Sequence, residues 1–177
     1  MIFKIKFVKL KGPCQPRNYT FPFKKFGAKS RQFNPAWFKE YPNWLEYSIS
    51  KDAAFCLCCY LFKPEVSEES GRESFVSEEF SNWKKKERLE THVGGPNSAH
   101  NQACGKCASI DCTRFLLRQG LAFRAHDESD DSKNQGNFLE LLRWLCNHNK
   151  DIEVATLKNA LNNLKLIAPD IQKDIVN

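Results

Sequence analysis

Two cysteines separated by two residues, followed by two histidines, constrain this sequence more than any other feature. Cys56 and Cys59 lie in the apolar stretch 55–62, where a tight turn can direct both thiolates at one ion. His92 ends a predicted basic helix, and His100 follows a Gly-Gly-Pro break that turns the chain back toward the cysteines. Tetrahedral zinc binds thiolate sulfur and readily accepts imidazole nitrogen as well. The pattern therefore predicts one structural zinc held by these four side chains.

Other arrangements of the eight cysteines stay open at this point. Cys104 and Cys107 form a second pair with the same spacing, so an all-thiolate zinc site is an alternative to the histidine pair. Cys58, Cys112 and the last cysteine, Cys146, are read as small buried hydrophobic residues. A thioredoxin-like redox pair is not favoured, because no parallel βαβ pattern surrounds the first pair.

The chain carries no segment that indicates secretion or a membrane. Its first ten residues are apolar but are broken by three lysines, unlike the continuous apolar centre of a secretory signal. The longest apolar run, 53–62, is about half of what a membrane-spanning helix needs. The sequence therefore predicts a soluble intracellular protein with no membrane partner, whose thiols stay reduced and available for metal binding.

Charge is distributed unevenly along the chain, which has a formal net charge of +6. Residues 1–51 contain eleven Lys and Arg but only two acidic residues, Glu40 and Glu46, whereas acidic residues are in excess in the remainder. Residues 1–30, rich in proline and lysine, are interpreted as a basic, largely extended arm. A basic half of this kind favours a polyanion such as DNA as partner, although a solubilising arm has the same composition.

The middle of the chain has the pattern of a small ββα-type zinc finger. Residues 44–49 and 53–56 are predicted to be two short strands joined by a turn, and 64–79 is predicted to be an acidic surface loop. A helix is predicted from Asn82 to about Val93, with Ser81 as its cap.

That predicted helix is amphipathic. Its apolar half is expected to pack on the strands, and its basic half, formed by Lys84, Lys85 and Arg88, is expected to contact DNA phosphates. A solvated charged face is the alternative interpretation of the same three residues. The aromatic residues of the finger are expected to form its core rather than to stack on bases; they are Trp37, Phe38, Trp44 and Tyr47.

From Ser109 onward the apolar spacing is helical. Phe138, Leu141, Leu142 and Leu145 follow one helical face, and a second such face runs from Val154 to Leu164; Gly120 and 126–136 separate the helices. The predicted fold class is α+β, with a small ββα-type zinc finger followed by an all-α helical segment. The expected domains are the arm (1–30), the finger (31–103) and an incomplete helical domain (104–177).

The motifs of the chain resemble those of a known family. The segments 33–37, 44–47, 55–62 and 80–83, together with the stretch from His92 to His100, resemble the TTF-type zinc finger of proteins derived from hAT-type transposases, a group that includes zinc finger MYM-type protein 1-like proteins. The segments 115–129 and 136–142 resemble the helical domain that follows this finger. In that family the first cysteine pair and two downstream histidines are the presumed zinc ligands, which map here onto Cys56, Cys59, His92 and His100.

The resemblance implies a nuclear, zinc-dependent DNA-binding protein. The sequence departs from it in joining the finger almost directly to the segment at 115, and it stops before the acidic-residue core of intact hAT transposases. The expectation is therefore a non-catalytic module with zinc as cofactor, DNA as partner and no small-molecule substrate. The alternative is a zinc-stabilised protein-interaction module that recruits another chain through the helical segment. The two alternatives differ in their expected salt dependence, which is steep only for DNA.

Overall fold

The structure is a computed structural model that describes residues 12–62, 75–76, 79–127, 129, 131–149 and 152–153. The chain divides into two compact units, Met1–Val93 and Gly94–Asn177. Within the described residues, no helix is both long enough and apolar enough to cross a membrane. The α+β class predicted from the sequence is confirmed by two-stranded sheets and several helices.

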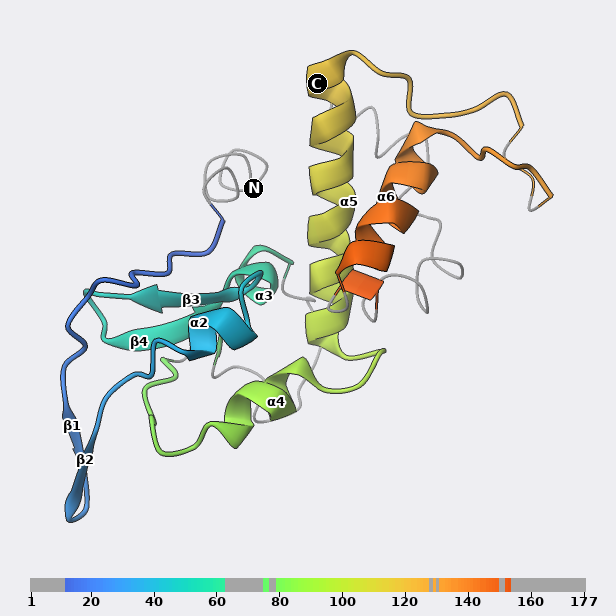
Figure 1. Cartoon of the computed structure of the whole chain (residues 1–177). Helices are drawn as coiled ribbons and strands as arrows, with labels where there is room; N and C mark the ends of the chain where they lie inside the picture. Colours follow the sequence, from blue (N-terminus) through green and yellow to red (C-terminus); the bar gives the residue numbers. More distant parts are fainter. Residues whose placement is uncertain are drawn as a thin grey trace. The chain divides into compact units, whose positions relative to one another are not determined.

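The central hairpin of the first unit was predicted from the sequence and is confirmed. It consists of β3 (Leu45–Ser48) and β4 (Ala53–Cys56), which pair antiparallel with Leu45 opposite Cys56 (Figure 1). Asp52, in the connecting turn, has a φ of 44°, a conformation that aspartate tolerates better than most residues. β4 is also bridged on its other side, since the Ala54 N–H donates to the Phe80 carbonyl at 2.8 Å.

An aromatic core fills the first unit. Phe33 lies at its centre, and its ring centroid is 4.9–5.3 Å from those of Phe21, Trp37, Phe38, Tyr47 and Trp83. All six rings are at most 5% exposed. Two of them, Trp37 and Phe38, come from the short helix α2 (Trp37–Glu40), which contacts β3. The prediction that the finger aromatics form a core is confirmed.

The basic helix of the finger is shorter than predicted. α4 spans Glu87–Val93 and does not begin at Asn82, so Ser81 does not occupy the position directly before it. The side chain of Asn82 instead accepts the Lys84 N–H at 3.3 Å, and its carbonyl accepts the Lys85 N–H at 3.0 Å. These bonds form turns that place Trp83 in the aromatic core.

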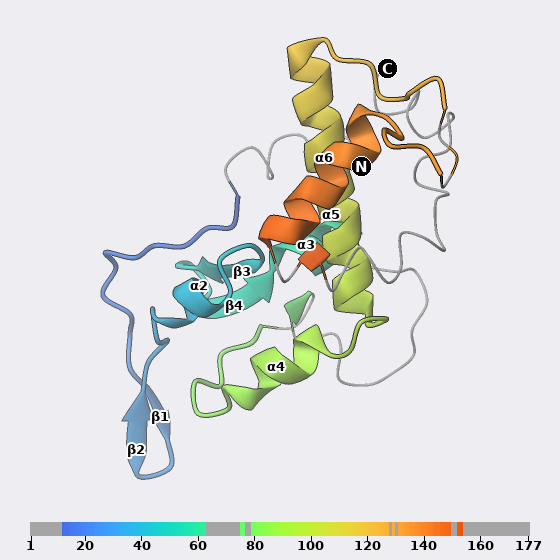
Figure 2. The ribbon, with the colours of Figure 1, turned by 45° about the vertical axis from the view of Figure 1, so that its right-hand side comes forward.

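The stretch before the finger is more ordered than the extended arm expected from its composition. β1 (Lys24–Phe26) and β2 (Lys29–Arg31) form a hairpin around Gly27, whose φ is 64°. The hairpin projects away from β3 and β4 (Figure 2). The side chain of Gln15 donates to three carbonyls near β3, the shortest bond being 2.8 Å to Leu45. Residues 12–33 therefore belong to the packed first unit; residues 1–11 lie outside the described part.

Two long helices form the second unit. α5 (Ala99–Gln119) begins ten residues before the helical pattern recognised at Ser109, and α6 (Asn137–His148) matches the helix predicted from its apolar spacing. The Ser98 hydroxyl caps α5 by accepting the Asn101 N–H at 3.1 Å. Gly120 ends α5 in the left-handed conformation, with a φ of 63°.

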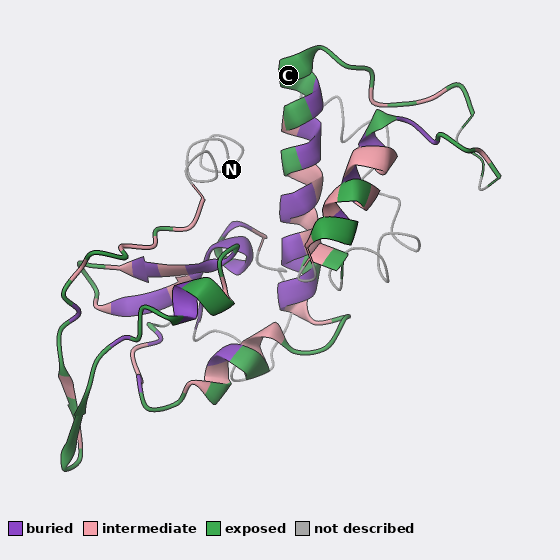
Figure 3. Ribbon diagram, viewed as in Figure 1, coloured by how far each residue is buried: buried purple, intermediate pink, exposed green. Residues whose placement is uncertain are grey.

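The two helices pack on one another through small and branched residues. Buried positions follow one side of α5, as Figure 3 shows. The shared core consists of Ala108, Cys112, Leu116, Phe138 and Leu142. The further helix predicted over 154–164 and most of the acidic loop predicted over 64–79 lie outside the described residues.

Candidate metal centre

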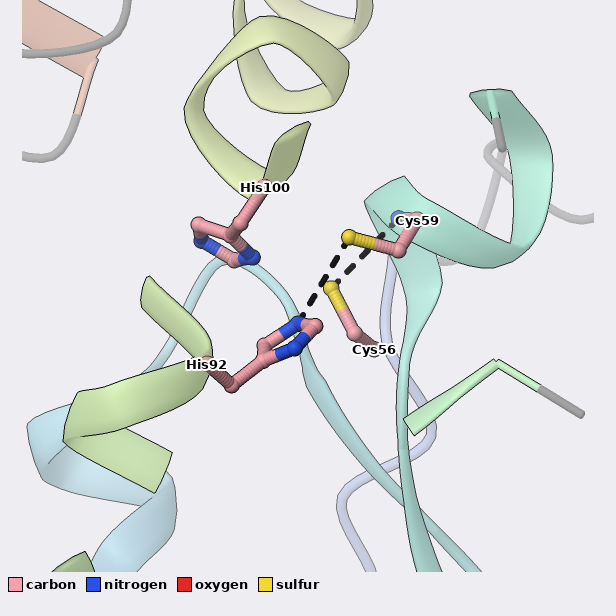
Figure 4. A group of neighbouring side chains, drawn as sticks. All are labelled: Cys56, Cys59, His92 and His100. Carbon is pink, nitrogen blue, oxygen red and sulfur yellow. Dashed lines mark hydrogen bonds between the residues drawn. The ribbon is translucent and has the colours of Figure 1, made fainter. Parts of the chain in front are cut away.

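The four residues predicted to bind zinc are brought together. Cys56 ends β4, Cys59 lies in α3 (Leu57–Phe62), His92 is near the end of α4, and His100 is in the first turn of α5 (Figure 4). Their ligand atoms all lie within 4.8 Å of one another. Three of the residues are buried and His92 is half-buried.

The two cysteines converge because the chain changes from strand to helix between them. The Leu57 N–H donates to the Trp44 carbonyl at 2.9 Å, which fixes the start of α3 against the hairpin. The Cys59 N–H then points back at Cys56, and the Cys59 nitrogen is 3.4 Å from the Cys56 Sγ atom. A backbone N–H directed at sulfur favours the thiolate, which is the form that binds a metal. The spacing of the pair predicted this convergence, whereas the helix α3 was not anticipated.

His92 is held in place by aromatic rings. Its ring centroid lies 4.5 Å from that of Phe75 and 5.5 Å from that of Trp44. Its Nε2 atom is 3.5 Å from Cys59 Sγ. Zinc bonds of about 2.0–2.1 Å to nitrogen and about 2.3 Å to sulfur at a tetrahedral angle place the two ligand atoms about 3.5 Å apart. The separation of Cys59 and His92 therefore matches two ligands of one zinc ion.

A compact turn brings His100 back after α4 ends. Gly94, with a φ of 62°, allows the reversal that an L-residue resists. The buried Asn101 side chain donates to the Gly95 carbonyl at 2.8 Å, and the Ser98 cap sets the first turn of α5. The Gly-Gly-Pro break noted in the sequence thus serves the function predicted for it.

The remaining cysteines lie outside this group. Within the described residues, the group of neighbouring potential metal ligands contains His92 and His100 rather than Cys104 and Cys107. Cys58 is buried beside the pair but is not part of the group. The donor set fits zinc, because two thiolates and two imidazoles complete a tetrahedral ion. Such a closed site leaves no position for a reacting water and is structural.

The three cations predicted to contact DNA are near one another in sequence but differ in secondary structure and in exposure. Lys84 and Lys85 are exposed in the turn before α4, and the half-buried Arg88 is on the helix itself. Their neighbour Lys86 is paired with Glu40 at 2.6 Å, and this hydrogen bond raises the pKa of the lysine.

Basic residues that the sequence analysis did not single out lie on the β1–β2 hairpin. Lys25, Lys29 and Arg31 are exposed there, whereas Lys24 forms an ion pair with Asp52 at 3.0 Å. The signal available in the sequence was the presence of two basic residues on each side of Gly27, within short segments that a glycine turn can join.

Comparison with known protein families assigns the chain to one of them. The family model of the ZMYM1/FAM200 RNase-like domain matches residues 73–110 and 107–177, which together are more than half of the chain. The chain belongs to this transposase-derived family. The matched region includes His92 and His100 but begins after the cysteine pair. No solved structure matches the chain.

Proposed function

We propose that this chain is a zinc-stabilised DNA-binding module of a transposase-derived protein and acts in the nucleus. In this proposal residues around the metal centre form a TTF-type finger, and α5 and α6 begin the helical domain that follows it in hAT-related proteins. The observation that carries the proposal is the closed Cys2His2 cluster, three of whose residues belong to the unit that carries an exposed group of cations. A structural zinc would order the finger, and the cations would then contact phosphates.

Two basic surfaces of the first unit support DNA as the partner. One is formed by Lys84, Lys85 and Arg88; the other is the β1–β2 hairpin with its exposed cations. A two-stranded ribbon is narrow enough to enter the major groove of duplex DNA. The rings of the aromatic core are buried and cannot stack on bases, so phosphate contact through these cations is the mode of binding that we propose.

A non-catalytic role is part of the proposal. Two-metal nucleases hold a pair of metal ions that stabilises the attacking and the leaving oxygen, and oxygen ligands such as carboxylates suit such ions. Within the described residues, the group of potential metal ligands is the Cys2His2 cluster, which offers no carboxylate. The matched family is described as RNase-like, and that description concerns the family rather than an activity of this chain.

The test is a titration of labelled duplex DNA at several salt concentrations. We expect the logarithm of the affinity to fall linearly with the logarithm of salt concentration, by about 0.9 for each neutralised phosphate. Replacing Lys84, Lys85 and Arg88 together with Ala should flatten that slope and weaken binding. The zinc content and the circular dichroism spectrum should stay unchanged.

A matched control removes three cations from the second unit. Lys106, Arg118 and Lys133 replaced together with Ala change the net charge equally, and this variant should bind with the wild-type slope. Equal slopes for the two triple variants would remove the turn before α4 from the DNA surface. An absence of binding by the wild-type chain at low salt would overturn the DNA proposal.

One observation favours a protein partner as the second candidate. An apolar groove of about 400 Å³ runs along α5 and α6, and its residues Phe115 and Trp144 are 50% and 56% exposed. Exposed aromatic residues beside a groove are typical of protein interfaces. Binding through this groove would be insensitive to salt and would be lost in Phe115→Ala/Trp144→Ala, whereas DNA binding would not.

A further inference from the structure

His100 makes a contact on its own helix that His92 does not share. Its Nε2 atom lies 3.4 Å from the Sγ atom of Cys104, one turn further along α5. Both residues are buried, at 4% and 8% exposure. His92, by contrast, directs its Nε2 atom at the ligand Cys59. The Nε2 atom of His92 therefore faces a ligand of the metal centre, whereas the Nε2 atom of His100 faces a cysteine outside the ligand group.

The chemistry of imidazole connects this contact to the choice of ligand atom. A neutral ring has one nitrogen that bears a proton and one that has a free lone pair, and only the second can bind a metal. If Nε2 donates its proton to Cys104 Sγ, the lone pair is on Nδ1. Figure 4 shows one ring nitrogen of His100 facing the two cysteine sulfurs and the other turned away from them.

We propose that His100 binds zinc through Nδ1 and that Cys104 is the positioning residue that selects this tautomer. The inference rests on the proposed zinc site. Histidine ligands of metals generally donate their second ring N–H to a neighbouring acceptor, which fixes the orientation of the ring. Here a thiol at the fourth residue along the same helix supplies the acceptor, so the helix itself sets the distance. His92 coordinates through Nε2, which gives the site one histidine of each kind.

The first experiment is nitrogen NMR of the zinc-loaded full chain, labelled with ¹⁵N at histidine. We expect His100 to have a metal-bound Nδ1 and a protonated Nε2, and His92 to have the reverse assignment. Coordination of His100 through Nε2 overturns the inference while leaving the zinc site intact. A chain that takes up no zinc overturns the metal centre itself, and the inference with it.

The second experiment measures zinc affinity by competition with a chelator. Cys104→Ala should weaken zinc binding about 10- to 100-fold, which is the usual effect of removing such a partner. Cys104→Ser, whose hydroxyl oxygen can accept the same proton, should recover most of the affinity. The control Cys107→Ala removes a buried cysteine of the same helix that lies outside the ligand group.

Equal affinities of Cys104→Ala and Cys107→Ala would overturn the positioning role. X-ray absorption of the wild-type zinc complex separates this role from direct ligation. Two sulfur neighbours are expected; a third that is lost in Cys104→Ala would identify Cys104 as a ligand and overturn the inference.

Discussion

The finger region and the helical pair keep their folds by different means. The strands β3 and β4 have four residues each, and α4 has seven, so none of these elements is stable by itself in water. They are held by an aromatic core and by side chains that converge on one point. α5, with 21 residues, and α6, with 12, instead share a continuous apolar face. The comparison predicts that metal removal affects the finger far more than the helical pair.

Cysteine shows the difference between the regions most clearly. Cys56 and Cys59 are buried where two histidines converge, whereas Cys112, in the apolar core of the helical unit, is equally buried without belonging to the ligand group. Burial therefore does not distinguish a ligand from a small hydrophobic residue. The distinguishing features are the two-residue spacing, the N–H directed at sulfur, and nearby imidazole nitrogens.

The largest effect is expected from loss of a thiolate ligand. Cys56→Ser should abolish zinc binding and unfold the finger, because a structural zinc supplies roughly 10–16 kcal/mol in small fingers at neutral pH. The near-ultraviolet dichroism of the buried tryptophans should collapse, while most helical signal from α5 and α6 should persist. Metal analysis and circular dichroism of the same sample provide the measurement.

Cys58→Ser is the matched control for that change. It alters a buried neighbour that is not in the ligand group, and it should keep one zinc per chain. A Cys56→Ser chain with native dichroism and no zinc would contradict the division between a metal-held finger and a self-supporting helical pair.

The next effect concerns the helical pair alone. Leu142 is 6% exposed in the core shared by α5 and α6, so Leu142→Ala leaves a cavity that should cost about 2–5 kcal/mol. Urea denaturation followed by far-ultraviolet dichroism measures this loss. Zinc content should remain at one ion per chain; its loss would show that the two regions are not independent.

A smaller effect is expected at the start of α5. Ser98→Ala removes the hydroxyl that caps this helix and should cost about 1 kcal/mol. Because His100 lies two residues further on, zinc affinity should fall as well. Ser98→Asp keeps an acceptor at the same position and should restore both quantities. A decrease in stability with unchanged zinc affinity would mean that the cap does not help to position His100.

The metal centre could be predicted from the sequence because its signals are local. The spacing of Cys56 and Cys59 and the Gly-Gly-Pro break before His100 both act over a few residues. The late start of the basic helix could not be predicted, because it depends on Trp83 packing against rings that are distant in sequence. A helical wheel assumes a regular helix and therefore placed Lys84 and Lys85 on it.

Two further features were not predicted from the sequence, the order of residues 12–33 and the early start of α5, and both depend on tertiary contacts. The order in residues 12–33 comes from tertiary contacts, such as Gln15 donating to carbonyls about thirty residues away and Phe21 packing into the aromatic core. α5 continues through Gly105, a residue that weakens isolated helices, because one side of this helix is buried along its length. Composition and local propensity contain no information on either contact.

The smallest effect is a pH dependence in the finger. Burial raises the pKa of the Glu46 carboxyl, and the hydrogen bond from the Cys14 backbone only partly opposes this. The folded state therefore binds the carboxyl proton more tightly than the unfolded state does. Above the raised pKa the ionised carboxylate lowers the free energy of unfolding. This destabilisation disappears as the pH falls through the raised pKa. Glu46→Gln keeps an acceptor for Cys14 without the charge, and at pH 7 it should be more stable than the wild type by roughly 0.5 kcal/mol or less. Urea denaturation of the two zinc-loaded chains between pH 7 and 5 should show that their difference in stability shrinks toward acid. Glu153→Gln, which removes one negative charge at an exposed position, is the control and should show no such trend. A difference that grows toward acid would mean that the Glu46 carboxylate stabilises the finger and that its pKa is lowered in the folded chain.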